Sequence, residues 1–281
     1  MKWVYLDGKY STAKDASISP DDRGFLFGDG SYEVIRSYHG KWFRLDSHLS
    51  RFKRSLDALR ISFESFPDFQ TIGRELQSLN GLIGQDASLY LQVTRGAAPR
   101  RHRFPDAGTS PTVYAALSPI RTDHGKWEEG VKIILLPDSR WSRCDIKSIS
   151  LLANVLACQE AVEQGAEEAV FVRDGTVREG THTNFCAVFG GEVWTHPADQ
   201  SILDGITRMT VIECCREIGI PLHEKPIPAS RLGDAAEVFI IGSITEIMPV
   251  TSIGGKSVAD GRPGSVTRAI QAAYGKRVDA L

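Results

Sequence analysis

Several features that would place this chain in a specialised class are missing. The formal net charge is −2, from 33 Lys and Arg against 35 Asp and Glu, so no broad basic surface for nucleic acid is indicated. No apolar stretch has the length needed to span a membrane. The first ten residues, MKWVYLDGKY, lack the apolar core of a signal peptide. We therefore expect a protein that binds neither nucleic acid nor membrane.

Cysteine is scarce and irregularly spaced. The five cysteines form no CxxC pair, and their number is odd. This pattern argues against a disulfide framework and against a zinc site, so we expect no metal. Reduced thiols fit a cytoplasmic location best. The cysteines are Cys144, Cys158, Cys186, Cys214 and Cys215.

Three catalytic signatures are also absent: the GxSxG elbow, the HExxH zinc motif and the Walker loop. Gly24, Gly28 and Gly30 lie close together, but their spacing does not match the GxGxxG dinucleotide fingerprint. The chemistry must therefore be sought in residues that no single short motif connects.

What is present is an ordinary globular composition, with 42% hydrophobic and 24% charged residues. A chain of 281 residues exceeds the usual size of a single core, which predicts two domains. We place the boundary in the polar stretch Arg121–Gly130, which gives a smaller N-terminal α+β domain, residues 1–122, and a larger C-terminal domain, residues 123–281. Strands joined as hairpins, with helices in separate blocks, favour α+β domains rich in antiparallel strands over a doubly wound parallel sheet.

In the first half, turn signals and periodicity locate the elements. Leu49, Phe52, Leu56 and Leu59 form one apolar stripe, which predicts a helix, with Asp46 as its N-cap. The other predicted elements are strands at Tyr32–Tyr38, Lys41–Leu45, Leu89–Thr94 and Val113–Leu117, a helix at Phe69–Leu79, and a long loop at Arg95–Ser110.

In the second half, a helix is predicted to begin near Ser150 and to stop near Gly165, with its apolar residues inside. Those residues are Leu151, Leu152, Val155, Leu156 and Ala161. The other predicted elements are strands at Val131–Leu136, Ala169–Arg173, Thr176–Arg178, Asn184–Phe189, Glu192–Thr195 and Glu237–Gly242, and a helix at Gly205–Ile218.

Two charged residues could carry chemistry. Lys147 precedes the strongly apolar helix. Most lysines are solvated, but a lysine drawn against an apolar wall can form a Schiff base. Glu179 closes the hairpin Thr176–Thr181, where a glutamate is usually solvated. The functional alternative is a carboxylate aimed at the protonated pyridine nitrogen of a cofactor.

Two places could bind an anion. The run Gly205–Arg208 opens a helix, whose free N–H groups attract phosphate, and Thr207 could add a hydroxyl. A simple glycine turn explains that run about as well. Arg51 lies on the striped helix beside Arg54, either as part of a solvated face or as a clamp on phosphate.

Arg100 and His102 stand one residue apart in the basic loop. The loop could simply be an exposed basic segment, but it could also trap a carboxylate, which Arg binds with two parallel hydrogen bonds. In an extended loop Arg100 and His102 point the same way and Arg101 the other way. Tyr32, on the strand Tyr32–Tyr38, shares a face with Val34 and Arg36.

In their order along the chain, these signals resemble the fold-type IV enzymes that depend on pyridoxal 5′-phosphate (PLP). The resemblance covers nearly the whole chain. It also reaches Glu246 and Pro249, and Thr94-Arg95-Gly96 followed by Arg100 and His102 is similar to the D-amino acid aminotransferases within that family. The stretches that carry it are Asp22–Gly24 through Gly28–Glu33, His48 with Arg51, Cys144–Ser148, Glu179-Gly180 with Asn184, and Leu203–Arg208.

The resemblance implies a role for each candidate residue. Lys147 forms the Schiff base with PLP and shuttles the proton, and Glu179 pairs with the pyridine nitrogen. Tyr32, Arg100 and His102 bind the substrate carboxylate, the latter two from the partner subunit of a homodimer. The cofactor site lies at the interface of the two domains, and its other binding residues are Arg51, Leu203, Ile206, Thr207 and Ser243. The substrates implied are D-amino acids and keto acids, with D-alanine and 2-oxoglutarate giving pyruvate and D-glutamate.

Three other functions remain open. A branched-chain L-amino acid aminotransferase shares the lysine, the glutamate and the phosphate residues but lacks the pair Arg100 and His102. A 4-amino-4-deoxychorismate lyase shares the same core and needs no keto-acid acceptor. A PLP-binding protein without turnover is the third, against which the presence of both Lys147 and Glu179 argues.

Overall fold

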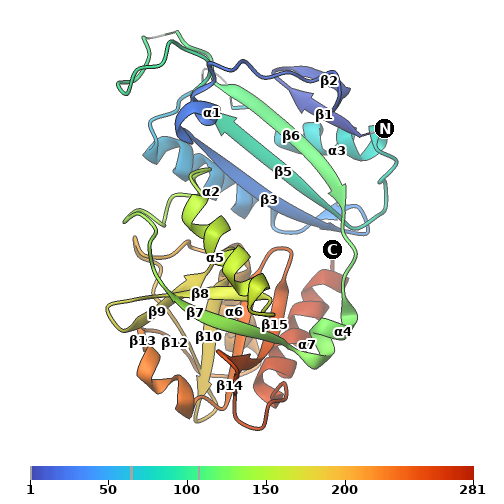
Figure 1. Ribbon diagram of the computed structural model, residues 1–281. Coiled ribbons are helices and arrows are strands. Elements are labelled where there is room, and N and C mark those ends of the chain that lie inside the picture. The colour runs from blue at the N-terminus through green and yellow to red at the C-terminus, as the bar shows by residue number, and fades with distance from the viewer. Residues whose placement is uncertain (1, 64–65, 107) are drawn as a thin grey trace. The chain divides into compact units, whose positions relative to one another are not determined.

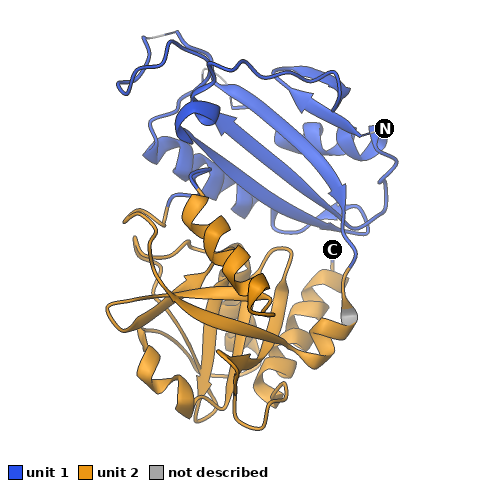
Figure 2. Ribbon diagram, in the orientation of Figure 1, with its two compact units in different colours: residues 1–121, 146–150, 281 blue, residues 122–145, 151–280 orange. Residues whose placement is uncertain are grey.

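The computed structural model describes residues 2–63, 66–106 and 108–281 (Figure 1). Their contacts divide into two compact units (Figure 2). Unit 1 consists of residues 1–121, 146–150 and 281, and unit 2 of residues 122–145 and 151–280. Residues 146–150, which include Lys147, therefore cluster with unit 1, whereas the expected domains place them within residues 123–281. The expected domain limits stay a prediction.

Unit 1 is built on an antiparallel sheet in the order β2-β1-β6-β5-β3-β4. The strands are β1 (Trp3–Leu6), β2 (Lys9–Thr12), β3 (Gly30–Tyr38), β4 (Lys41–Trp42), β5 (Ala87–Thr94) and β6 (Thr112–Pro119). The helices are α1 (Arg23–Phe27), α2 (Leu45–Ala58) and α3 (Phe69–Leu79). The predicted α+β class is thus confirmed, and α3 has the predicted bounds.

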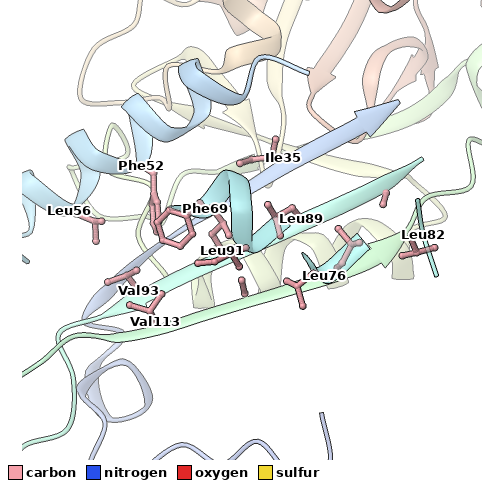
Figure 3. Close-up of a cluster of buried hydrophobic side chains, with 14 of the residues drawn as sticks. Ile35, Phe52, Leu56, Phe69, Leu76, Leu82, Leu89, Leu91, Val93 and Val113 are labelled. Carbon is pink, nitrogen blue, oxygen red and sulfur yellow. The ribbon is translucent and has the colours of Figure 1, made fainter. Parts of the chain in front are cut away.

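The core of unit 1 lies between one face of this sheet and helices α2 and α3 (Figure 3). In β5, Leu89, Leu91 and Val93 point into the core, and Ser88, Tyr90 and Gln92 alternate with them. Phe52 of α2 is fully buried, with its ring centroid 5.6 Å from that of Phe69 in α3. The stripe predicted on α2 therefore does face the sheet.

Unit 2 contains a larger mixed sheet, in the order β12-β11-β10-β14-β15-β7-β8-β9-β13, with β16 beside β15. Most neighbours are antiparallel, and β7 is parallel to both β8 and β15. The strands are β7 (Val131–Pro137), β8 (Glu168–Arg173), β9 (Thr176–Gly180), β10 (Asn184–Phe189), β11 (Glu192–Thr195), β12 (Leu222–Glu224), β13 (Ile227–Pro228), β14 (Glu237–Gly242), β15 (Glu246–Ile253) and β16 (Lys256–Ser257).

An additional pairing between β9 and β10 makes this sheet close on itself. The path β10-β14-β15-β7-β8-β9 returns to β10 through one residue pair, Glu179 opposite Asn184. A closed sheet leaves no unpaired edge along that path. One candidate site residue, Glu179, therefore stands where the ring of strands is joined.

The helices of unit 2 are α4 (His124–Glu129), α5 (Leu152–Glu163), α6 (Ile206–Glu217), α7 (Ser265–Asp279) and the short 3₁₀ helix η1 (Ala229–Asp234). Helix α4, which was not predicted, lies in the polar stretch Arg121–Gly130 where the domain boundary was expected. Helix α7 was not predicted. Its first turn is capped by Glu237 of β14, whose carboxylate accepts from the backbone N–H groups of Val266 and Thr267 at 2.9 and 2.7 Å.

The predicted interior of α5 is right for Ala161, which is fully buried, and wrong for three of the larger residues. Leu152, Val155 and Leu156 are 72%, 59% and 63% exposed. The small side chains of Ala157 and Ala161 are the ones that pack, against a cluster that includes Phe171. A helix with apolar residues on every side gives no period from which its buried face can be read.

Two boundaries at the end of the β3–β4 hairpin are also wrong. The expected strand Lys41–Leu45 ends at Trp42, and α2 begins at Leu45. The helix has Arg44 as its N-cap residue, without a side-chain cap, and Asp46 lies within its first turn. The carboxylate of Asp46 is still favourably placed there, because the N-terminus of a helix attracts negative charge.

We expect Phe52→Ala to lower the free energy of unfolding of unit 1 by about 3–5 kcal/mol, because the change leaves a cavity in a closed core. Leu156→Gln on the exposed face of α5 should change the free energy of unfolding of unit 2 by less than about 0.5 kcal/mol. Urea denaturation, followed by hydrogen exchange, measures both changes. Peptides of unit 1 report the effect of Phe52→Ala, and peptides of α5 report the effect of Leu156→Gln. A large loss of stability in Leu156→Gln would mean that this face of α5 is in contact with other protein atoms in solution.

Candidate active site

The segment Ile146–Ser150 forms a short ladder beside the start of β3. The backbone N–H of Tyr32 donates to the carbonyl of Lys147 at 3.1 Å, and the Ser31 hydroxyl donates to the same carbonyl at 2.9 Å. The N–H of Lys147 donates to Oγ of Ser55 in α2 at 3.1 Å. The backbone of the lysine is therefore fixed on both sides, and only the side chain keeps rotational freedom.

The amine of Lys147 lies over the face of Tyr32. Its Nζ is 4.2 Å from the centre of the Tyr32 ring, which stacks on Tyr90 with 5.8 Å between ring centres. An ammonium group over an aromatic face is held by the negative potential of the ring. The side chain is half-buried, so the solvated lysine that the local run favoured is not what the structure shows. The structure brings together two candidate residues, Lys147 and Tyr32.

A buried ion cluster holds Arg51 behind this strand. Glu33 of β3 is fully buried and accepts from Nε and Nη2 of Arg51 at 3.0 and 2.7 Å. His48 Nδ1 lies 3.1 Å from Oε1 of the same carboxylate. Burial alone would raise the pKa of Glu33, but the charges of Arg51 and His48 lower it well below its usual range. Burial is also the main cause that lowers the pKa of His48.

Arg51 is thus oriented by a carboxylate that the sequence did not single out. Glu33 lies in one of the stretches that carry the family resemblance, but no spacing rule connects it with a helix that begins twelve residues later. The strand places Glu33 on the face toward α2, opposite to that of Tyr32. One strand therefore positions both the lysine's aromatic neighbour and the arginine's carboxylate.

In unit 2, Glu179 is buried at the end of β9 and its carboxylate is fully engaged. Oε1 accepts from Nη1 of Arg140 at 2.5 Å. Oε2 accepts from Nδ2 of Asn184 and from the N–H of Leu203, both at 3.0 Å. Glu179 is only 6% exposed, so the solvated hairpin-end alternative is wrong.

Arg140 is itself held by a second buried carboxylate. Asp138 accepts from Nε and Nη2 of Arg140 at 2.9 and 3.1 Å, and the guanidinium lies 4.4 Å from the centre of the Phe171 ring. Burial by itself would lower the pKa of Arg140, but its bonds to Asp138 and the charge of Glu179 raise it. The sequence alone does not distinguish this pair, because Arg143 and Asp145 are also two residues apart and form a partly exposed pair.

The segment before α6 approaches the same carboxylate. The carbonyl of Leu203 accepts from Asn184 Nδ2 at 2.9 Å. A Cβ atom at Gly205 would lie 1.9 Å from Oδ1 of Asn184, so this close approach requires glycine. Ile206 and Thr207, which open α6, are buried, and Gly205 provides no side-chain cap. Ser243 follows β14 in a turn and is half-buried.

Arg100 and His102 lie together in unit 1, around Phe27 of α1. The ring centre of Phe27 is 5.2 Å from Cζ of Arg100 and 5.6 Å from the ring centre of His102. Both side chains are otherwise exposed. Across residues 2–63, 66–106 and 108–281, no hydrogen bond, ion pair or ring contact joins either of them to Tyr32 or Lys147.

The donors and acceptors fall into four groups that have distinct chemistry. Lys147 with Tyr32 offers a primary amine on an aromatic face, and Arg51 offers an oriented guanidinium. Glu179 offers a fixed, buried carboxylate. Arg100 with His102 offers an exposed pair of nitrogen donors. An amine, a cation and a carboxylate are the groups needed to bind an aldehyde, a phosphate and a protonated ring nitrogen.

This chain is similar to known proteins over nearly its whole length. The family described as amino-transferase class IV matches residues 30–253. D-alanine aminotransferase from Bacillus licheniformis is 41% identical over 96% of this chain and 95% of its own, and that from Staphylococcus epidermidis is 37% identical over 100% and 99%. The crystal structure of the Escherichia coli branched-chain amino acid aminotransferase has a TM-score of 0.88 at 26% identity, covering 98% of this chain and 94% of the other.

We expect Glu33→Gln to destabilise unit 1 by about 3–5 kcal/mol at pH 7, because it leaves Arg51 buried without a counter-charge. The folded-state pKa of Glu33 is depressed, so its contribution is present above the unfolded value near 4.3 and is lost as the pH falls toward the folded value. The difference between wild type and variant should therefore narrow by about 1–2 kcal/mol between pH 5 and 3. Urea titrations at several pH values measure it, and a difference that does not vary with pH would contradict the charge assignment.

Proposed function

Because this chain belongs to the class IV aminotransferase family, we propose that it binds PLP and transfers amino groups between D-amino acids and keto acids. D-alanine and 2-oxoglutarate are the substrates and pyruvate and D-glutamate the products. The observation that carries this proposal is the amine of Lys147 on the ring of Tyr32, in a chain that matches D-alanine aminotransferases along its whole length. Bound PLP supplies an aldehyde for the amine and a ring that takes up electrons.

The residues of both units fit this group by the chemistry of their donors. In unit 1, Lys147 supplies the amine that would hold the cofactor. The hydrogen bonds of the Lys147 backbone to Tyr32 and Ser55 limit the positions that Nζ can reach. The same amine would be the base that moves the proton at the alpha carbon of the substrate. Tyr32 lies against this amine and contributes its hydroxyl to the substrate carboxylate.

Glu179 holds the proton on the pyridine nitrogen. Its carboxylate is fixed by Arg140, Asn184 and the N–H of Leu203, so it need not reorganise when a positive charge is placed beside it. A preorganised carboxylate is worth more in a buried site than in water. Leu203 is also assigned to the cofactor, since its backbone is bound to both Glu179 and Asn184.

The phosphate is assigned to Arg51, to Ile206 and Thr207 at the start of α6, and to Ser243. A helix N-terminus presents free N–H groups, and the 12-residue α6 has no side-chain cap to compete for them. Arg51 adds a guanidinium whose orientation is set by Glu33.

The substrate carboxylate is assigned to Tyr32, Arg100 and His102. Arg100 and His102 are exposed and contact Phe27 in their own chain, and we assign them to the site of the partner subunit in a homodimer, as in the family that the chain resembles. No nucleic acid takes part. Across the described residues, no helix is both long and apolar enough to cross a membrane. The thiols, all within the described residues, are free, which supports a cytoplasmic location.

Two other activities compete with this one. A branched-chain L-amino acid aminotransferase is supported by the solved structure with a TM-score of 0.88. Its lower identity of 26%, against 41% for a D-alanine aminotransferase, favours the D-amino acid assignment. A lyase acting on 4-amino-4-deoxychorismate would release pyruvate without a keto-acid acceptor, so an absolute requirement for the acceptor separates it from a transaminase.

We expect borohydride reduction of the purified enzyme to fix PLP on Lys147, since this amine is the one on the aromatic face. The measurement is peptide mapping of the reduced protein. Lys126, whose amine pairs with Glu167 on the surface, serves as the internal control. Label on any lysine other than Lys147 would overturn the assignment of the cofactor lysine.

Glu179→Gln should leave PLP bound but slow transamination by about 10²–10³-fold, because a neutral amide holds the pyridinium proton less well. The readouts are turnover and the pH dependence of the absorbance of the bound cofactor. The amide can still accept from Asn184 and Leu203, but it no longer neutralises the buried Arg140, so the variant should also unfold at a lower urea concentration than the wild type. Near-native turnover would show that Glu179 is only a structural residue of the closed sheet.

The enzyme should prefer D-alanine to L-alanine and to L-leucine. With the carboxylate fixed by Arg100 and His102 and the proton face fixed by Lys147, one enantiomer alone presents its alpha hydrogen to the amine. Arg100→Ala should lower kcat/KM for D-alanine about 10–100-fold, through loss of a charge-assisted bond. Initial rates with both enantiomers, against 2-oxoglutarate and pyruvate, measure this. Turnover of L-leucine with none of D-alanine would overturn the substrate assignment.

A further inference from the structure

The loop that carries Arg100 and His102 is tied down at both of its ends. At one end Arg95 is buried, and its Nε and Nη2 bind the carboxylate of Asp29 at 2.8 and 2.9 Å. The same guanidinium donates to two backbone carbonyls that follow α2. Further along, the ring of Phe104 returns to lie 3.7 Å from Cζ of Arg95. The segment between residues 95 and 104 is therefore closed on itself.

Arg23 fixes the backbone in the middle of this segment. Its side chain is 4% exposed, and its Nε binds Oδ2 of Asp29 at 2.8 Å. Its Nη1 donates to the carbonyl of Arg101 at 2.6 Å and to that of Arg103 at 3.4 Å. These carbonyls stand on either side of His102, so the backbone that presents His102 is held by a buried guanidinium.

Phe27 fixes the side chains. Its ring is approached by Arg23, with Cζ at 4.8 Å from the ring centre, by Arg100 at 5.2 Å and by the His102 ring at 5.6 Å, tilted by 53°. Long exposed side chains lose conformational entropy when they bind a ligand. Packing two of them on one ring before the ligand arrives removes part of that cost.

We propose that Phe27 and Arg23 are positioning residues for the substrate carboxylate: Arg23 sets the backbone of the loop and Phe27 aligns Arg100 with His102. This inference rests on the proposed function, in which these two side chains receive the carboxylate. Neither Phe27 nor Arg23 touches the substrate. Their effect is to hold the nitrogen donors of Arg100 and His102 in a fixed relative orientation before the substrate binds.

The kinetic test uses Phe27→Leu, which keeps apolar bulk but removes the aromatic face. Phe25→Leu, on the same helix and with a ring that is 78% exposed, is the matched control. We expect Phe27→Leu to lower kcat/KM for D-alanine about fivefold, mainly through KM, as for the loss of one cation–π contact. Phe27→Tyr should restore it. For a simple amine without a carboxylate, kcat/KM should stay unchanged in all three variants.

A second readout does not depend on the substrate. The chain has 7 histidines, so the ¹³Cε1 signals of the PLP-loaded enzyme can be resolved, and His102→Gln identifies that of His102. Phe27→Leu and Arg23→Lys should move this signal, the first by loss of the ring current and the second by release of the loop backbone, whereas Phe25→Leu should not. The absorbance of bound PLP should be the same throughout.

The outcomes separate the two proposals. If the unmodified enzyme does not use D-alanine but the His102 signal moves in Phe27→Leu, the proposed substrate is wrong and the role of Phe27 in aligning the loop stands as a structural one, without the carboxylate. If D-alanine is a substrate and the losses are equal for D-alanine and the amine, or the His102 signal does not move, the positioning role of Phe27 and Arg23 is overturned.

Discussion

The buried carboxylate of Glu179 is the constraint around which unit 2 is arranged. An ionised carboxylate removed from water is tolerated only when donors replace the lost hydration. Here the donors come from Arg140, Asn184 and the backbone of Leu203. Each donor imposes a further requirement: Arg140 needs Asp138, and Asn184 needs a glycine at position 205. The pairing of Glu179 with Asn184 also joins the ring of strands.

Unit 1 also contains a buried carboxylate that must be compensated, and a different set of residues compensates it. Glu33 is fully buried, and Arg51 and His48 of α2 satisfy it from one direction. A partner removed from either cluster would leave a charge without compensation, which costs more than the pair itself contributes. In each unit a structural ion cluster is thus connected directly to a residue assigned to the cofactor. Stability and the geometry of the site are consequently difficult to alter separately.

The sequence was sufficient for elements whose signals are local. Helix α3 and strands β10, β11 and β14 have the predicted bounds, because period and turn residues mark both ends. The sequence was insufficient where a contact with a residue far away in the chain determines whether a helix is capped or which of its faces is buried. Helix α7 is capped by Glu237, and α5 is buried through two alanines that its apolar pattern does not distinguish. Arg140 and Arg143 each stand two residues from an aspartate, but only the fold buries the first pair. The family resemblance identified Lys147 and Glu179, whereas the roles of Glu33, Arg140 and Phe27 depend on contacts with residues far away in the sequence.

The five residues 146–150 belong by their contacts to unit 1, although the chain on both sides of them belongs to unit 2. The polypeptide therefore leaves unit 1 after residue 121, returns for this short ladder beside β3, and leaves again. Neither unit is a continuous piece of chain. A ribosome completes the sheet of unit 1 well before it supplies the strand-like segment that carries the lysine. Cutting the gene after residue 121 would yield a first fragment that keeps the Tyr32 and Tyr90 rings and the buried Arg51 but lacks the lysine amine that lies over Tyr32.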